Sequence, residues 1–130
     1  MKKKKVLVII TIMLTMVSAV ALALNPADVA RRAEQIKGWA SNQLSQARTI
    51  NSRSMRLETK IETIQSIRDA IYRELGNLEM LNDQMLAEGK NFDSNQESIF
   101  HSSWMETADY LVEVDDMLIG LIHELENRNN

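Results

Sequence analysis

The side chains that could do chemistry in this 130-residue chain are two histidines and a surplus of carboxylates. Glu97 and His101 stand four residues apart, so both could reach one metal ion from the same face of a helix. Di-iron helical bundles, however, place a glutamate three residues before each histidine, whereas Ser98 and Gly120 occupy those positions before His101 and His123. The spacing therefore favours surface histidines over metal ligands, and we expect no metal and no cofactor.

The machinery of nucleophilic catalysis is missing from the sequence. There is no cysteine, and residues 24–130 contain neither G-x-S-x-G nor S-x-x-K. A glycine loop that could hold a phosphate is also absent. Methionines in this range fall at or beside apolar rows, which is typical of core packing rather than of copper binding (Met55, Met80, Met85, Met105 and Met117). We therefore expect no catalytic residues and predict that the protein is not an enzyme.

The first 23 residues have the pattern of an export signal. Lys2–Lys5 precede the uncharged stretch Val6–Leu24, and Ala21–Ala23 fits a cleavage site. Asn25-Pro26 then suits the N-cap and first turn of a new helix. We predict a signal peptide over 1–23; the alternative is an uncleaved membrane anchor, because this stretch is about as short as a bilayer span can be. Both interpretations leave the rest of the chain outside the cytoplasm, in the periplasm or at the cell surface.

The remaining residues, 24–130, form one predicted all-α domain. Strand patterns are nearly absent, and the clear interruption is a turn over 89–93, where Gly89 suits a left-handed helix end. Ser94, followed three residues later by a glutamate, fits a capping box that starts the next helix. We predict a helix over about 26–88 and a second over about 94–127, folded back antiparallel.

Apolar residues repeat at sevenfold spacing along both predicted helices, as they do in coiled coils. The strongest row of the first helix holds Val29, Ile36, Gln43, Ile50, Leu57, Ile64, Ile71, Leu78 and Met85, and the second helix has Trp104, Leu111, Leu118 and Leu125. With the turn centred on Asn91, the second row falls on the first, and Arg68 falls beside Asp115. We predict a long antiparallel helical hairpin with coiled-coil-like packing, in which Arg68 and Asp115 fix the register.

The charge distribution agrees with this pairing. Residues 24–73 hold nine basic and five acidic side chains, whereas residues 74–130 hold two basic and thirteen acidic ones. The opposite signs suit helices that lie side by side, although exposed ion pairs contribute little stability. The net negative charge and the export signal together argue against nucleic acid as a partner.

The predicted helices differ in length. The second reaches back only to about Leu57, so the apolar stripe over 26–54 has no partner within the chain, and an exposed stripe of that size marks an interface. We predict a partner surface formed by Val29, Ala33, Ile36, Trp39, Ala40, Ala47 and Ile50. The alternative is a three-helix bundle with a break near 49–54, a run of weak helix formers. This run has neither glycine nor proline, which favours a continuous helix.

These observations predict an exported, non-enzymatic structural or interaction protein of the bacterial envelope. It would self-associate or dock on a partner protein through the N-terminal part of its long helix, and an uncleaved anchor would add membrane contact. The alternative from another class is a periplasmic helical chaperone or stress-sensor module. A metal-handling helical bundle is the third and weakest candidate.

Overall fold

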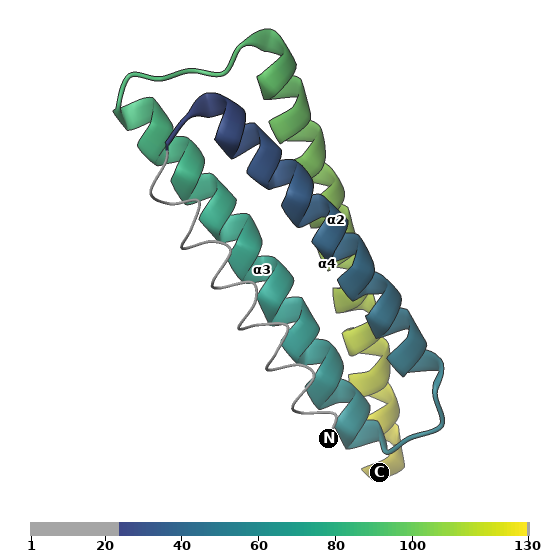
Figure 1. Cartoon of the computed structure of the whole chain (residues 1–130). Helices are drawn as coiled ribbons and strands as arrows, with labels where there is room; N and C mark the ends of the chain where they lie inside the picture. Colours follow the sequence, from purple (N-terminus) through teal and green to yellow (C-terminus); the bar gives the residue numbers. More distant parts are fainter. Residues whose placement is uncertain (1–23, 130) are drawn as a thin grey trace.

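The computed structural model describes residues 24–129, and these fold into three helices. α2 spans Pro26–Ser52, α3 spans Leu57–Ala87 and α4 spans Ser94–Asn129. The chain runs along α2, returns along α3 and reverses again into α4, so α2 and α4 are parallel to each other (Figure 1). The all-α prediction is confirmed, whereas the predicted signal peptide over 1–23 lies outside the described residues.

The structure differs from the single helix predicted over 26–88 and has the alternative arrangement, with a break close to 49–54. α2 ends at Ser52, and Arg53 has extended backbone angles, φ −77° and ψ 149°. Just before the break, the Thr49 hydroxyl donates to the carbonyl four residues earlier, and the Ser52 hydroxyl donates to the Thr49 carbonyl. Such side-chain bonds to the backbone weaken a helix without requiring glycine or proline.

The break allows the apolar stripe of α2 to pack on the other two helices. Leu44 and Ala47 share a core cluster with Ile64 and Leu118, and towards the other end of the bundle Ile36 packs with Leu78. Complete burial of one large aliphatic side chain stabilises a fold by about 1.5–3 kcal/mol. Several such side chains outweigh the few helical hydrogen bonds that the break removes.

The alignment of α4 on α3 follows the pattern of the sequence. Leu118 lies in the same core cluster as Ile64, and Trp104 packs in the cluster that contains Leu78. These are the pairs expected when the turn between the two helices is centred on Asn91. The α3–α4 part of the predicted hairpin is therefore present, with α2 added as a third helix beside it.

The turn between α3 and α4 is closed by Gly89, the residue predicted for this position. Its φ of 76° lies in the left-handed region, which costs glycine little. The Gly89 amide donates to the Leu86 carbonyl at 3.0 Å, and the Lys90 amide donates to the Met85 carbonyl at 3.1 Å. This pair of hydrogen bonds is a Schellman motif, and it satisfies carbonyls at the end of α3.

Polar side chains cap the first turns of α2 and α4. The Asn25 side chain accepts a hydrogen bond at 2.9 Å from the amide two residues later, as expected for the predicted N-cap. At α4 the cap is one residue earlier than the predicted pair of Ser94 and Glu97. The Asp93 carboxylate accepts from the Gln96 amide at 2.7 Å, and the Gln96 side chain accepts from the Asp93 amide at 2.9 Å. Asp93 and Gln96 thus form the reciprocal capping box.

Candidate interaction site

The residues predicted as a partner surface lie in the core of the protein itself. Five of them are 1% exposed or less, while Trp39 and Ile50 are partly buried against the same clusters (buried: Val29, Ala33, Ile36, Ala40 and Ala47). The prediction assumed a single helix over about 26–88. Residues 26–54 of that helix would have extended past the end of the second helix, which would have left the stripe uncovered. Because the chain breaks after Ser52, α3 and α4 cover the stripe, and the structure corrects this assignment.

Arg68 and Asp115 lie together between α3 and α4. Arg68 Nε donates to Asp115 Oδ1 at 2.9 Å, and the guanidinium also lies 4.9 Å from the centre of the Tyr72 ring. The hydrogen bond to Asp115 is the main reason why the pKa of Arg68 is raised. Both side chains are partly exposed, so the pair contributes modestly to stability, about 0–1 kcal/mol.

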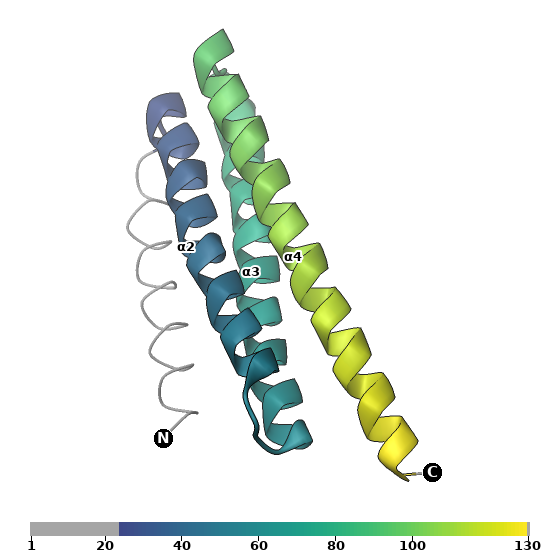
Figure 2. The ribbon, with the colours of Figure 1, turned by 90° about the vertical axis from the view of Figure 1, so that its right-hand side faces the viewer.

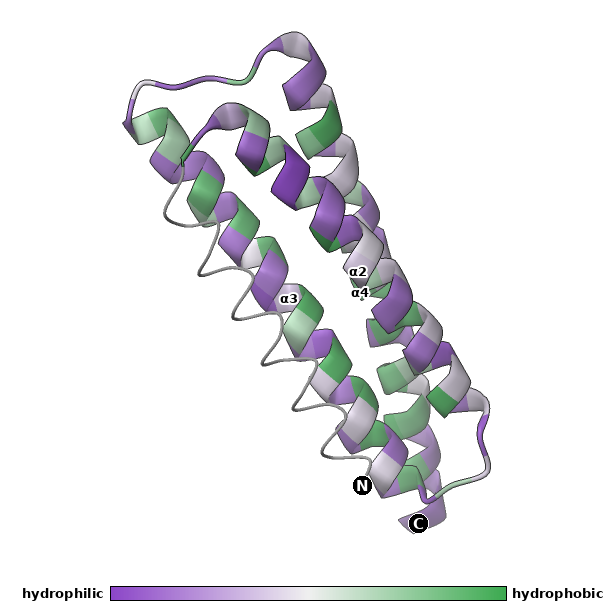
Figure 3. Ribbon diagram, in the orientation of Figure 1, coloured by the Kyte–Doolittle hydropathy of each residue, from purple (hydrophilic) through white to green (hydrophobic). Residues whose placement is uncertain are grey.

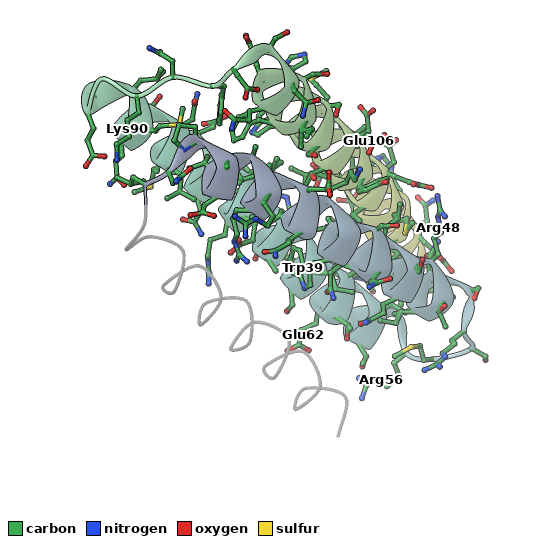
Figure 4. All side chains as sticks on the ribbon, turned by 45° about the horizontal axis from the view of Figure 1, so that its top comes forward. Trp39, Arg48, Arg56, Glu62, Lys90 and Glu106 are labelled. Carbon is green, nitrogen blue, oxygen red and sulfur yellow. The ribbon has the colours of Figure 1, made fainter. Side chains whose placement is uncertain are left out.

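Ion pairs also join α2 to α4. Arg48 Nη2 lies 2.6 Å from Glu113 Oε1 and 2.7 Å from Glu113 Oε2, which is a strong charge-assisted contact, and Lys37 Nζ lies 3.5 Å from Glu106 Oε2. Figure 4 shows Arg48 and Glu106 on the side of the bundle where α2 and α4 run together. Glu106 and Glu113 are therefore paired with basic side chains of α2.

The opposite, outer side of α4 carries an exposed apolar row. Met105, Val112 and Ile119 are 45%, 58% and 54% exposed, and the exposed Ile122 follows Ile119 by one helical turn, displaced toward the side of Trp104. Residues seven apart lie two turns apart, about 10 Å along the axis, so these side chains align on one face. Figure 2 shows α4 at one side of the bundle, and Figure 3 colours the residues of all three helices by hydropathy. We call Met105, Val112, Ile119 and Ile122 the α4 outer row.

Sevenfold spacing alone could have revealed the α4 outer row. The row was missed because Trp104 and its partners already explained the apolar residues of this helix as core. Each of these three exposed residues directly follows a member of the row that begins at Trp104, and one residue turns the side chain by about 100° away from the core (Met105 after Trp104, Val112 after Leu111 and Ile119 after Leu118). A second heptad row beside the first was the available sign of a second apolar face on this helix.

Carboxylates flank the α4 outer row. Asp109 follows Met105 by four residues, and Asp116 follows Val112 by four, so each carboxylate lies on the same side of the helix as an apolar side chain. Within residues 24–129, neither aspartate forms an ion pair. The outer face of α4 therefore combines exposed apolar groups with uncompensated negative charge.

An open pocket of about 220 Å³ lies between α3 and α4 near one end of the α4 outer row. Its wall from α3 consists of Glu79, Asn82 and Asp83, and its wall from α4 consists of Phe100, His101 and Trp104. Trp104 Nε1 is buried and has no hydrogen-bond partner among the described residues. The pocket thus joins two aromatic residues and two carboxylates.

A buried ion pair, Arg32 and Glu74, joins α2 to α3 and was not anticipated. Arg32 Nη2 lies 3.9 Å from Glu74 Oε2, and the side chains are 2% and 1% exposed. Burial raises the pKa of Glu74 to about 7, opposed by the charge of Arg32 and by a hydrogen bond from Asn77. Glu74 follows Ile71 by three residues and precedes Leu78 by four, so its position on the apolar seam was the sign that it would be buried.

The histidines do not form a metal centre with the carboxylates near them. His101 and His123 are exposed, and within residues 24–129 no group of three or more His, Cys, Asp or Glu side chains could hold a metal ion. None of the three described helices is long and apolar enough to cross a membrane.

No family model, curated protein or solved structure matches this chain.

Proposed function

We propose that this protein is an exported, non-enzymatic interaction protein of the bacterial envelope that docks a partner protein on the outer face of α4. The observation that carries the proposal is the α4 outer row, an exposed apolar row on a helix whose other face is already buried. Four of the large apolar side chains exposed within residues 24–129 belong to this row. Exposed apolar side chains that align along one helix face are typical of a contact surface.

The negative charge beside the row favours a basic partner over a second copy of the chain. If two α4 helices packed face to face, Asp109 and Asp116 of one would lie close to the same residues of the other, and like charges across an interface oppose association. An amphipathic helix with an apolar row flanked by lysine or arginine would instead match both the apolar and the acidic groups. Such a helix would lie along α4 in the helix-in-groove mode.

Export is supported by the first 23 residues of the sequence. Lys2–Lys5, the uncharged stretch after them and the small residues at Ala21–Ala23 form the three parts of a secretory signal. The chain has no cysteine, so its stability outside the cytoplasm would come from the packing of its three helices rather than from disulfides. The partner is therefore sought in the periplasm or at the cell surface.

Two synthetic helical peptides test the docking proposal by calorimetry. Both carry leucine at sevenfold spacing; one has flanking lysines and the other has glutamates at the same positions. We expect the basic peptide to bind, and Val112→Asn/Ile119→Asn to raise its Kd at least tenfold. Met80→Asn, which changes an equally exposed apolar residue on α3, is the matched control and should leave the Kd unchanged.

Three results would contradict this proposal. The first is equal binding of the acidic peptide, and the second is binding of the basic peptide that the Val112 and Ile119 substitutions do not alter. The third is a dimer of the protein in light scattering that dissociates when Val112 and Ile119 are replaced, because the occupant of the face would then be a second copy.

A further inference from the structure

We propose that the pocket between α3 and α4 receives an arginine side chain of the docked partner. This inference rests on the proposed docking of a basic helix along α4 and names the residue that would anchor it. The pocket lies where such a helix would end, because its lining residues Trp104 and His101 stand one and four residues before Met105, the first member of the α4 outer row.

The aromatic walls suit a guanidinium group. The Phe100 and Trp104 rings both line the pocket, and a planar guanidinium stacks on such rings through cation–π attraction, most strongly on tryptophan. Phe100 also packs on Phe92, with ring centroids 5.1 Å apart, so its ring is held in place by the turn before α4. A fixed ring loses little freedom when a ligand arrives.

The carboxylates supply the charge that an arginine requires. Glu79 and Asp83 are four residues apart on α3 and line the same pocket. Neither forms an ion pair within the described part of the chain. Paired nitrogen donors of a guanidinium can reach a carboxylate through two parallel hydrogen bonds, which a lysine ammonium cannot reproduce.

The indole N–H resonance of Trp104 gives a direct test by ¹H–¹⁵N NMR. The chain has two tryptophans, so Trp39→Phe identifies the Trp104 resonance. We titrate N-acetyl-arginine amide and the uncharged analogue N-acetyl-citrulline amide, which has nearly the same shape. The arginine probe should shift the Trp104 indole resonance, and the citrulline probe should shift it at least tenfold more weakly at equal concentration.

Paired carboxylate substitutions complete the test. Glu79→Gln/Asp83→Asn should raise the Kd of the arginine probe at least tenfold, whereas Glu34→Gln/Glu126→Gln, which removes the same charge from exposed positions elsewhere, should change it less than twofold. Equal shifts with citrulline, or an unchanged Kd in the pocket variant, would overturn the inference. Binding of the basic peptide along α4 without any response to the arginine probe would reject the pocket alone. A response to the arginine probe without binding of the basic peptide would reject the docking face and, with it, the assignment of the arginine to a docked partner.

Discussion

Arg32 and Glu74 are the two ionisable side chains that the described part of the bundle buries most deeply. Removing a carboxylate from water disfavours its charged form, and the neighbouring arginine compensates only in part. The pKa of Glu74 is accordingly raised to about 7. A group with a folded-state pKa above its unfolded value makes the fold most stable at low pH, and this contribution is lost as pH rises through the folded pKa.

Replacement of Glu74 by glutamine should flatten the pH dependence of stability. From the ordinary glutamate pKa of 4.5 to about 7, the folded wild type retains a proton that the unfolded chain has released. Its free energy of unfolding should therefore fall by about 3 kcal/mol more than that of Glu74→Gln between pH 4 and pH 8. Urea denaturation at several pH values measures both profiles. Parallel profiles would show that Glu74 titrates normally.

The contact between Arg68 and Asp115 should be weak despite its short distance. The two side chains are partly exposed, so water screens the attraction. A double-mutant cycle with Arg68→Gln and Asp115→Asn should give a coupling energy of about 0–1 kcal/mol by urea denaturation. A coupling above about 2 kcal/mol would mean that this pair, rather than the apolar clusters, dominates the pairing of α3 with α4.

The helix ends show how local backbone geometry shapes the elements. Gly89 has a positive φ, whereas Gly38 lies within α2 with nothing near the position of an added Cβ. Alanine in the left-handed region is strained by about 1–2 kcal/mol, but alanine within an exposed helix stabilises by about 0.5–1 kcal/mol over glycine. Gly89→Ala should therefore lower the melting temperature, and Gly38→Ala should raise it. A higher melting temperature for Gly89→Ala would contradict the assigned turn.

The elements themselves differ in how far the sequence predicts them. Gly89 and the heptad rows locate the end of α3 and the pairing of α4, because glycine conformation and apolar periodicity act locally. The break after Ser52 depends on a comparison that no local pattern contains. A continuous helix keeps more backbone hydrogen bonds, but folding back buries Ile36 and its neighbours, and this gain appears only when all three helices are placed together.

Within residues 24–129, the apolar face of α2 is buried, whereas the α4 outer row is exposed. Ile36 is 1% exposed in the core, whereas Val112 is 58% exposed on α4. Ile36→Ala should lower the free energy of unfolding by about 2–4 kcal/mol through the cavity that it leaves, and Val112→Ala should change it by less than about 0.5 kcal/mol. Urea denaturation of both variants checks the contrast. A large loss in Val112→Ala would place that residue in a core.

The candidate site was harder to predict than the fold for the same reason. A heptad row indicates that a surface will be buried, but it does not say whether the chain itself or another protein buries it. The row that begins at Val29 was assigned to a partner and proved to be core, while the row that begins at Met105 is the exposed one. Only the number of helices around each row decides between these outcomes.

The proposed cleavage after Ala23 predicts the mass of the protein isolated from cells. If residues 1–23 are a signal peptide, the exported protein begins at Leu24, because Ala21–Ala23 matches the small residues that signal peptidases require. The intact mass of the protein recovered from the periplasm or medium should correspond to residues 24–130. A mass that includes Met1 would instead support the uncleaved anchor.

Leu24 is already part of the folded bundle. Its side chain packs in a cluster with Val29, Leu81 and Met85, and its carbonyl accepts a hydrogen bond from Lys90 Nζ at 2.8 Å. Proteases cut accessible, extended segments rather than packed ones. If the chain is cleaved immediately before Leu24, this packing favours a cut made while the three helices are still apart, and a later cut would require this end of the bundle to open again.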